Sequence, residues 1–154
     1  MKLDEQELPH VLAGVFLDVH RHVGPGIHVD AYKACVAHEL RMREIIFEQD
    51  APLGLTYKGL EVPVAGTHDF IVEDLVLINV LAVDAILPIH KETLQNHLRI
   101  SGRRTGFLVN FNVPLLRDGG IKRIIVSKSE PALRFKVIEN PVSSVDSRAK
   151  AGIR

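Results

Sequence analysis

The stretch VLINVLAVDAILPIH, residues 76–90, decides the fold, because it joins a core strand to the start of a helix. Seven of its first eight residues are apolar, which is typical of a strand covered on both faces. The exception is Asn79, a lone amide in the middle of the run. Pro88 suits the first turn of a helix, so the stretch predicts a buried strand, a short connection and a helix.

Apolar periodicity on either side of this stretch predicts an α/β fold with three helices and five strands. Gly24, Pro25 and Gly26 end the first helix, and Gly102 ends the third. Pro52 and Gly54 are expected to interrupt the first extended segment. This order of elements predicts a small mixed β-sheet flanked by helices. In chain order the elements are helices over 5–22 and 28–45, strands over 45–63, 67–72 and 75–83, a helix over 88–101, and strands over 105–111 and 121–127.

The length of 154 residues suits one compact domain, which we place at residues 1–126. Residues 127–154 have weak periodicity and several Pro and Ser, and they are expected to form a C-terminal extension with a mobile end. The single cysteine, Cys35, allows no internal disulfide and favours a reducing, cytoplasmic compartment. The first ten residues are polar and acidic, unlike a signal peptide, and no apolar run has the roughly 20 residues of a membrane span.

The formal net charge is zero, but the charges are divided unevenly. Residues 1–75 hold 6 Lys/Arg and 13 Asp/Glu, whereas residues 76–154 hold 13 and 6. A zero net charge argues against strong nonspecific nucleic-acid binding. A local basic face for a polyanion remains an alternative, formed by the cations after the third helix and in the last strand. Its residues are Arg99, Arg103, Arg104, Lys122 and Arg123.

An ordered series of motifs covers residues 8–126. They are VHRHVGPGIHVDAYKACVAHEL (19–40), YKG (57–59), HDFIVED (68–74), LAVDAILPIH (81–90), TGFLVNFN (105–112) and GIKRII (120–125). In this order they resemble the GxxExxY family, a prokaryotic branch of the PD-(D/E)xK nuclease-like superfamily. The resemblance implies the nuclease-like α/β core and a metal-dependent phosphodiesterase site.

That site, as the resemblance implies it, uses a carboxylate on a helix, an Asp on the second strand, a Glu-x-Lys on the third, and often a Gln and a Tyr on the next helix. Carboxylates hold Mg²⁺ through oxygen, and the metal activates water and stabilises charge on the phosphate. In this chain the helix carboxylate falls on Val29, the strand-two Asp on Asp69, the Glu and Lys on Asn79 and Leu81, the Gln on Thr93, and the Tyr on His97.

Only Asp69 keeps the residue type that the resemblance implies among the principal acidic and basic positions. Asn79 is then interpreted as a relic of a catalytic Glu, and it projects with Leu81 to one side of its strand. Asp69 needs a partner in its apolar strand, for which Asn79, Thr67, a backbone amide or a residual metal or ligand site are the alternatives. The sequence therefore predicts a catalytically inactive, nuclease-like binding or assembly module, with no cofactor expected and a homodimer as one plausible assembly.

The alternative is a working metal-dependent nuclease with a rearranged site acting on DNA or RNA. Asp69 and His97, with His28 as a further candidate, would then hold a transition metal such as Mn²⁺ or Zn²⁺ in place of Mg²⁺. His68 neighbours Asp69 in the sequence, but adjacent strand residues point to opposite faces, so we expect it to point away. Aromatic residues make up only 5% of the chain, so base stacking on single strands is poorly supported.

Overall fold

The computed structural model describes residues 3–127, so all but the first residue of the predicted C-terminal extension lies outside the described residues. The types and the order of the predicted elements are confirmed within that range. The elements are α1 (Leu8–Val23), α2 (Val29–Met42), β1 (Phe47–Tyr57), β2 (Leu60–Val72), β3 (Val76–Leu81), α3 (Pro88–Ser101), β4 (Thr105–Asn110) and β5 (Ile121–Ile125).

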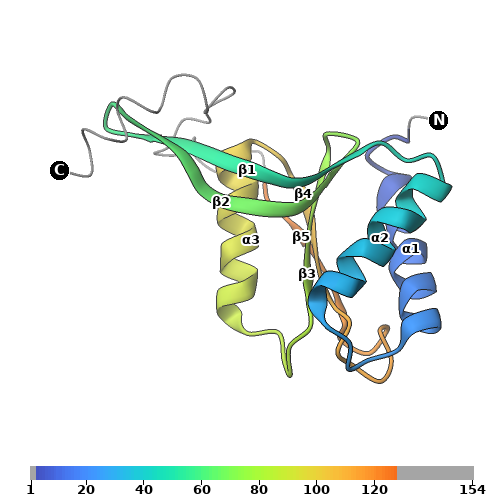
Figure 1. The fold of residues 1–154 in the computed structure, drawn as a ribbon. Coiled ribbons are helices and arrows are strands. Elements are labelled where there is room, and N and C mark those ends of the chain that lie inside the picture. The colour runs from blue at the N-terminus through green and yellow to red at the C-terminus, as the bar shows by residue number, and fades with distance from the viewer. Residues whose placement is uncertain (1–2, 128–154) are drawn as a thin grey trace.

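The five strands form one sheet in the order β1-β2-β3-β4-β5. All neighbouring strands are antiparallel except β3 and β4, which are parallel and connected through α3. The predicted mixed sheet is therefore confirmed. Figure 1 shows α1 and α2 on one side of the central strands and α3 on the other. In the described part of the chain, no helix combines the length and apolar character that crossing a membrane requires.

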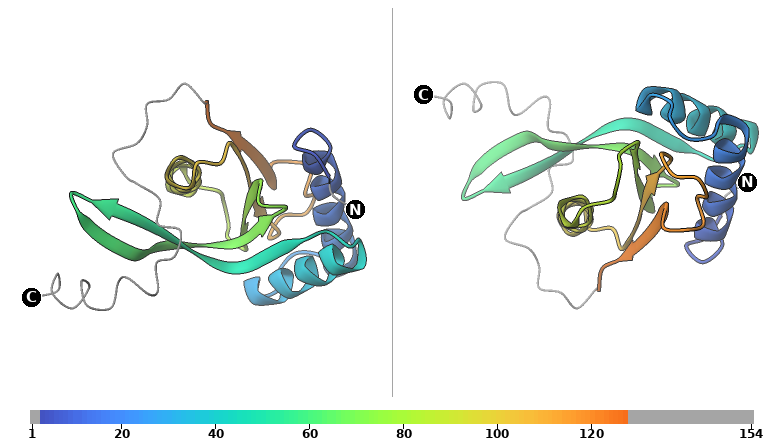
Figure 2. Two further views of the ribbon diagram at one scale, coloured as in Figure 1. Left: turned by 90° about the horizontal axis from the view of Figure 1, so that it is seen from above. Right: turned by 90° about the horizontal axis from the view of Figure 1, so that it is seen from below.

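One difference from the prediction is the long hairpin of β1 and β2. The strand continues through Pro52 and Gly54, although its pairing with β2 shifts register between Leu53 and Leu55. The chain reverses only at Lys58 and Gly59, which both have positive φ angles. Pro52 fits because β1 is an edge strand and its side chain is exposed. The hairpin extends past the core and runs beside α3, which Figure 2 shows lying between this hairpin and β5.

Two hydrophobic cores lie on the two faces of the sheet, and β3 supplies both. Val76, Ile78 and Val80 pack into the larger core with α1 and α2. Leu77 and the partly buried Leu81 pack into the smaller core with α3. The apolar run of β3 is explained by this double burial, since alternate side chains enter different cores.

The turn between α1 and α2 is fixed to the end of β4 by aromatic and amide side chains. Tyr32 stacks on Phe111 with ring centroids 4.7 Å apart, and its hydroxyl donates to the carbonyl of Gly24 at 2.6 Å. The backbone N–H of Gly26 donates to Oδ1 of Asn112. Gly26 has a φ of 84°, a left-handed conformation that glycine adopts without strain. The start of α2 is thereby placed firmly against the sheet.

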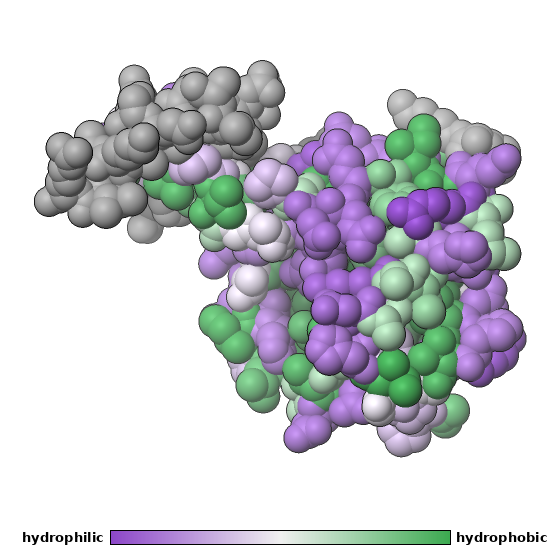
Figure 3. All heavy atoms as spheres, viewed as in Figure 1, coloured by the Kyte–Doolittle hydropathy of each residue, from purple (hydrophilic) through white to green (hydrophobic). Residues whose placement is uncertain are grey.

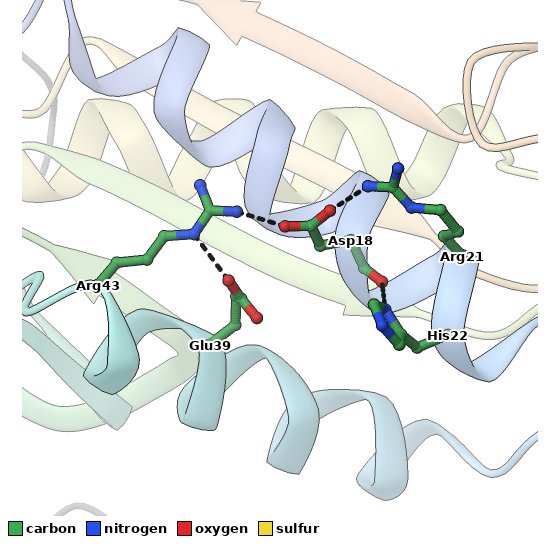
Figure 4. Close-up of polar contacts among 5 residues, drawn as sticks. All are labelled: Asp18, Arg21, His22, Glu39 and Arg43. Carbon is green, nitrogen blue, oxygen red and sulfur yellow. Dashed lines mark hydrogen bonds and ion pairs between the residues drawn. The ribbon is translucent and has the colours of Figure 1, made fainter.

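Charged side chains join the outer surfaces of α1 and α2 (Figure 4). Arg43 bridges the two helices, with its guanidinium 2.6 Å from Asp18 and 2.7 Å from Glu39. Asp18 also pairs with Arg21, and its backbone carbonyl contacts the His22 ring at 2.8 Å. The charges of this cluster are matched within it, so we interpret it as a link that holds α2 in place.

Candidate functional site

The candidate site lies where β2 separates from β3. Their paired residues end with Phe70 opposite Ile78. Asp69 precedes Phe70 on β2, and its side-chain Oδ2 accepts a hydrogen bond from the backbone N–H of Val80 at 2.6 Å. β2 then continues along β1 alone. Asp69 therefore sits at the fork between the strands, where its carboxylate takes the place of a backbone acceptor.

The second carboxylate oxygen of Asp69 forms an ion pair with Lys33 of α2, with 3.0 Å between Oδ1 and Nζ. The exposed fraction is 23% for the Lys33 side chain and 18% for that of Asp69. Of the partners considered from the sequence, a backbone amide is the one observed, and no hydrogen bond joins Asn79 to Asp69 within residues 3–127. Sequence reasoning missed Lys33. Its one signal was its position four residues after Val29, on the same face of a helix.

The two β3 residues at the expected Glu and Lys positions, Asn79 and Leu81, are uncharged. Asn79 lies opposite Leu108 and Leu81 opposite Asn110 in the parallel pairing with β4. Leu81 packs against the smaller core beside α3, and Asn79, two residues before it, faces the same way. Val80 points into the larger core on the other side, as the sequence predicts.

The two remaining helix positions are also neutral. Val29 is the first residue of α2 and packs, partly buried, against the larger core. Thr93 lies on α3, where its hydroxyl donates to the carbonyl of Ile89 at 2.7 Å. The Thr93 hydroxyl is therefore satisfied within its own helix.

His97 faces a different part of the molecule. Its ring contacts His68 with 5.0 Å between the centroids, on the side of β2 that faces α3. The prediction that His68 points away from Asp69 agrees with these contacts. Within residues 3–127, no group of three or more His, Cys, Asp or Glu side chains is arranged to hold a metal ion.

The Lys33–Asp69 pair and the His68–His97 contact lie on opposite sides of β2 because this strand changes face between His68 and Asp69. Phe70 packs into the larger core, whereas Ala51, the β1 partner of His68, packs into the smaller one. Residues two apart on a regular strand share a face, so the strand must change face at Asp69. Asp50, which lies between the β1 partners of Phe70 and His68, has a φ of 55°.

Burial makes both histidines weak bases. Burial, together with the neighbouring charges of His97 and Arg103, lowers the pKa of His68 to about 4. Burial also lowers the pKa of His97. Both rings are therefore neutral at pH 7.

The five predicted basic contacts do not share one face. Arg103 pairs with the Asp74 side chain, and its Nε donates to the Asp74 carbonyl at 3.2 Å. Lys122 and Arg123 are consecutive on β5, opposite Leu108 and Phe107, which belong to different cores. Lys122 and Arg123 therefore project from opposite faces of the sheet. Arg99 and Arg104 lie at the end of α3 and just beyond it, on either side of Arg103.

A cavity of about 660 Å³ lies away from the fork, between the end of α1 and the loop after β4. Its lining is mainly apolar, and its charged residues are Arg21, Arg117 and Asp118. Its size falls within the usual range of small-molecule sites in proteins, about 300–1,000 Å³. The sequence gave no indication of it, because its two walls are about 90 residues apart.

A model of the PD-(D/E)XK nuclease superfamily matches residues 6–124. The chain belongs to this superfamily. The match extends over all three helices and over all the strands except the last residue of β5. No curated protein and no solved structure matches the chain. The fork at Asp69 is thus part of a PD-(D/E)XK nuclease-like fold.

Proposed function

We propose that the chain is a nuclease-like protein without metal-dependent nuclease activity, and that it acts as a binding or assembly module. The observation that carries the proposal is the ion pair between Lys33 and Asp69. The resemblance to the GxxExxY family, together with this pair, supports the interpretation of the fork as a degenerate active site.

The ion pair makes the fork unsuitable for Mg²⁺, which prefers near-octahedral coordination by oxygen, usually with one or two carboxylates. One oxygen of Asp69 accepts from Val80 and the other contacts the ammonium group of Lys33. Val29 and Asn79 supply no further carboxylate. A divalent cation would have to displace the ammonium group of Lys33, and it would then contact only one negatively charged group, the carboxylate of Asp69.

The surface supports ligand binding better than binding to a polyanion. Arg103 is neutralised by Asp74, and Lys122 and Arg123 lie on opposite faces of the sheet. In Figure 3 hydrophilic residues form a band down the middle of the molecule, and apolar residues lie on both sides of it. The cavity beside α1 is the more suitable binding surface.

The direct test is a nuclease assay on the full chain. Plasmid, single-stranded DNA and RNA are incubated with Mg²⁺, Mn²⁺ and Zn²⁺, with Asp69→Ala as the matched control. We expect no cleavage that differs between the two proteins. Cleavage by the unchanged chain that disappears in Asp69→Ala would refute the proposal.

A second candidate function follows from the same ion pair. Lys33 brings an ammonium group to the fork, the type of group that the resemblance expects at Leu81. In a rearranged metal-dependent nuclease, Lys33 would stabilise charge on the phosphate. Lys33→Met would then abolish cleavage as completely as Asp69→Ala does. A chain with no cleavage to lose rules this candidate out.

Rebuilding the implied site tests the positions themselves. The triple variant Val29→Glu, Asn79→Glu and Leu81→Lys should be less stable than the unchanged chain, because it introduces charges at partly buried positions. We expect appreciable Mg²⁺ binding, measured by calorimetry, only after Lys33→Ala is added. Equal Mg²⁺ affinity with and without Lys33 would show that this residue does not block the fork.

A further inference from the structure

The β1–β2 hairpin carries an apolar face near its tip. Leu55 lies opposite Val62 and Tyr57 opposite Leu60 in the antiparallel pairing. Because cross-strand partners and residues two apart on a strand share a face, these four side chains form one surface, which we call the hairpin face. Neither core of the described residues includes any of them, and the exposed fractions of Tyr57 and Leu60 are 49% and 37%. A two-stranded hairpin is only marginally stable by itself in water, so this face favours a covering partner.

The hairpin face lies on the side of the sheet that α3 covers. Leu53, two residues before Leu55 on β1, is only 3% exposed, and its partner Gly66 lies against the His97 ring of α3. The register shift between Leu53 and Leu55 spans two residues of β1 and four of β2, so alternate side chains keep the same face on both strands. In Figures 1 and 2 the tip of the hairpin projects past α3, so the hairpin face extends beyond the cover that this helix provides.

The described chain ends on this same side of the sheet. Val126 is buried in the smaller core together with Ala51 of β1, and its N–H donates to the carbonyl of Arg104, just after α3. From Ala51 to Tyr57 the strand rises about 20 Å, at roughly 3.4 Å per residue. Residues 127–132, when extended, span up to about 20 Å. The chain from residue 133 onward is therefore long enough to reach the hairpin face.

One stretch of the C-terminal extension has the pattern that this face requires. Although the extension as a whole has weak periodicity, apolar and basic residues alternate strictly over LRFKV, residues 133–137. Such alternation places the apolar side chains on one side of an extended chain and the basic ones on the other. The apolar residues are Leu133, Phe135 and Val137, and the basic residues are Arg134 and Lys136.

We propose that residues 133–137 pack on the hairpin face, with their apolar side chains against it and their basic side chains toward solvent. The contact ties the C-terminal extension to the nuclease-like core by burying apolar surface on both partners. It also keeps this part of the hairpin from associating with a second copy of the chain. The contact involves no residue of the fork at Asp69, so it is independent of the proposed function.

Limited proteolysis of the full chain by trypsin tests this contact, because trypsin cuts after Arg134 and Lys136. Tyr57→Asp changes the hairpin face and leaves both cleavage sites intact. We expect this variant to be cut at the two sites at least about tenfold faster than the unchanged chain, since cleavage follows the population of the unpacked segment. Thr56→Asp is the matched control, because Thr56 lies on the opposite face of the hairpin, and its cleavage rate should equal that of the unchanged chain.

A second pair of variants changes the extension itself. Phe135→Ser should also speed cleavage at the two sites, whereas Val145→Ser, an apolar substitution outside residues 133–137, should not. The unchanged chain should have a monomeric mass by light scattering, and its cleavage rate should not depend on protein concentration.

Equal cleavage rates in the unchanged chain and in Tyr57→Asp would overturn the proposal. Slow cleavage that speeds up on dilution, together with a dimeric mass, would also overturn it, because a second copy would then supply the cover. Neither assay measures nuclease activity, so failure of this contact and failure of the proposed function are distinguishable.

Discussion

Replacing Lys33 by methionine removes the cation at the fork and keeps most of the apolar stem. Asp69 then retains its hydrogen bond from Val80 as its charge-stabilising contact in the described residues. An exposed ion pair contributes about 0–1 kcal/mol, and breaking a buried one costs about 3–5 kcal/mol. With both side chains about one-fifth exposed, we expect a loss of about 2 kcal/mol. For a chain of this length that lowers Tm by about 4–8 °C.

A double-mutant cycle separates the ion pair from other effects of the substitution. Asp69→Asn removes the charge but leaves an oxygen that can accept from Val80, so it preserves the link between β2 and β3. The free energy of unfolding is measured by urea denaturation for both single variants and for the double variant. We expect the double variant to be about 1–2 kcal/mol more stable than the sum of the single losses implies.

Additive losses, within about 0.5 kcal/mol, would refute this reasoning. They would mean that Lys33 and Asp69 do not stabilise each other in solution. Asp69 would then be available to a metal, and the proposal of an inactive fork would lose its main support. The nuclease assay on the same proteins would show whether that availability has a chemical consequence.

Three further predictions concern residues on the sheet. Asn110→Ala should lower the free energy of unfolding by about 2–3 kcal/mol in urea, because this buried amide both donates to and accepts from the backbone of Val83. Gly66→Ala should lower Tm, and the drop should shrink in a His97→Ala background because the added Cβ meets that ring. The contribution of His68 to the free energy of unfolding should be fully present above about pH 6.5, and the free energy should fall by about 3 kcal/mol as pH approaches 4. The reason is that the unfolded chain binds a proton at His68 in this range, whereas the buried ring of the folded chain does not. His68→Phe should reduce this pH dependence of the free energy of unfolding, and an unchanged pH dependence would contradict its assignment to His68.

Apolar periodicity was enough to predict the types and the order of the elements, whereas the nuclease-like fold was expected from the family resemblance. β3 and β4 are buried on both faces, so their sequences are mostly apolar and easily recognised. The β1–β2 hairpin was harder, since Pro52 and Gly54 are typical breakers of extended chain. They are tolerated because β1 lies at the sheet edge, a property that only the strand order reveals.

The candidate site was only partly predictable for a related reason. Comparison with a family pattern examines the expected positions, and so it identified Asp69 but gave no reason to examine Lys33. Lys33 is recognised only in the structure, because the packing of α2 against the fork brings its side chain to the Asp69 carboxylate. The contact between His68 and His97 depends on the change of face at Asp69, which a strict alternation of side chains does not predict.

On the proposal of a degenerate site, the charges at the fork explain why several residues would change together. In the site that the resemblance implies, three carboxylates at positions 29, 69 and 79 would repel one another and need a divalent cation to balance them. With Val29 and Asn79 neutral, Asp69 carries a single negative charge, which one ammonium group from Lys33 balances. On this proposal the fork needs no metal to balance its charge. Restoring one carboxylate alone would create an excess charge that neither Lys33 nor a weakly held Mg²⁺ compensates, so recovery of a metal site requires several substitutions together.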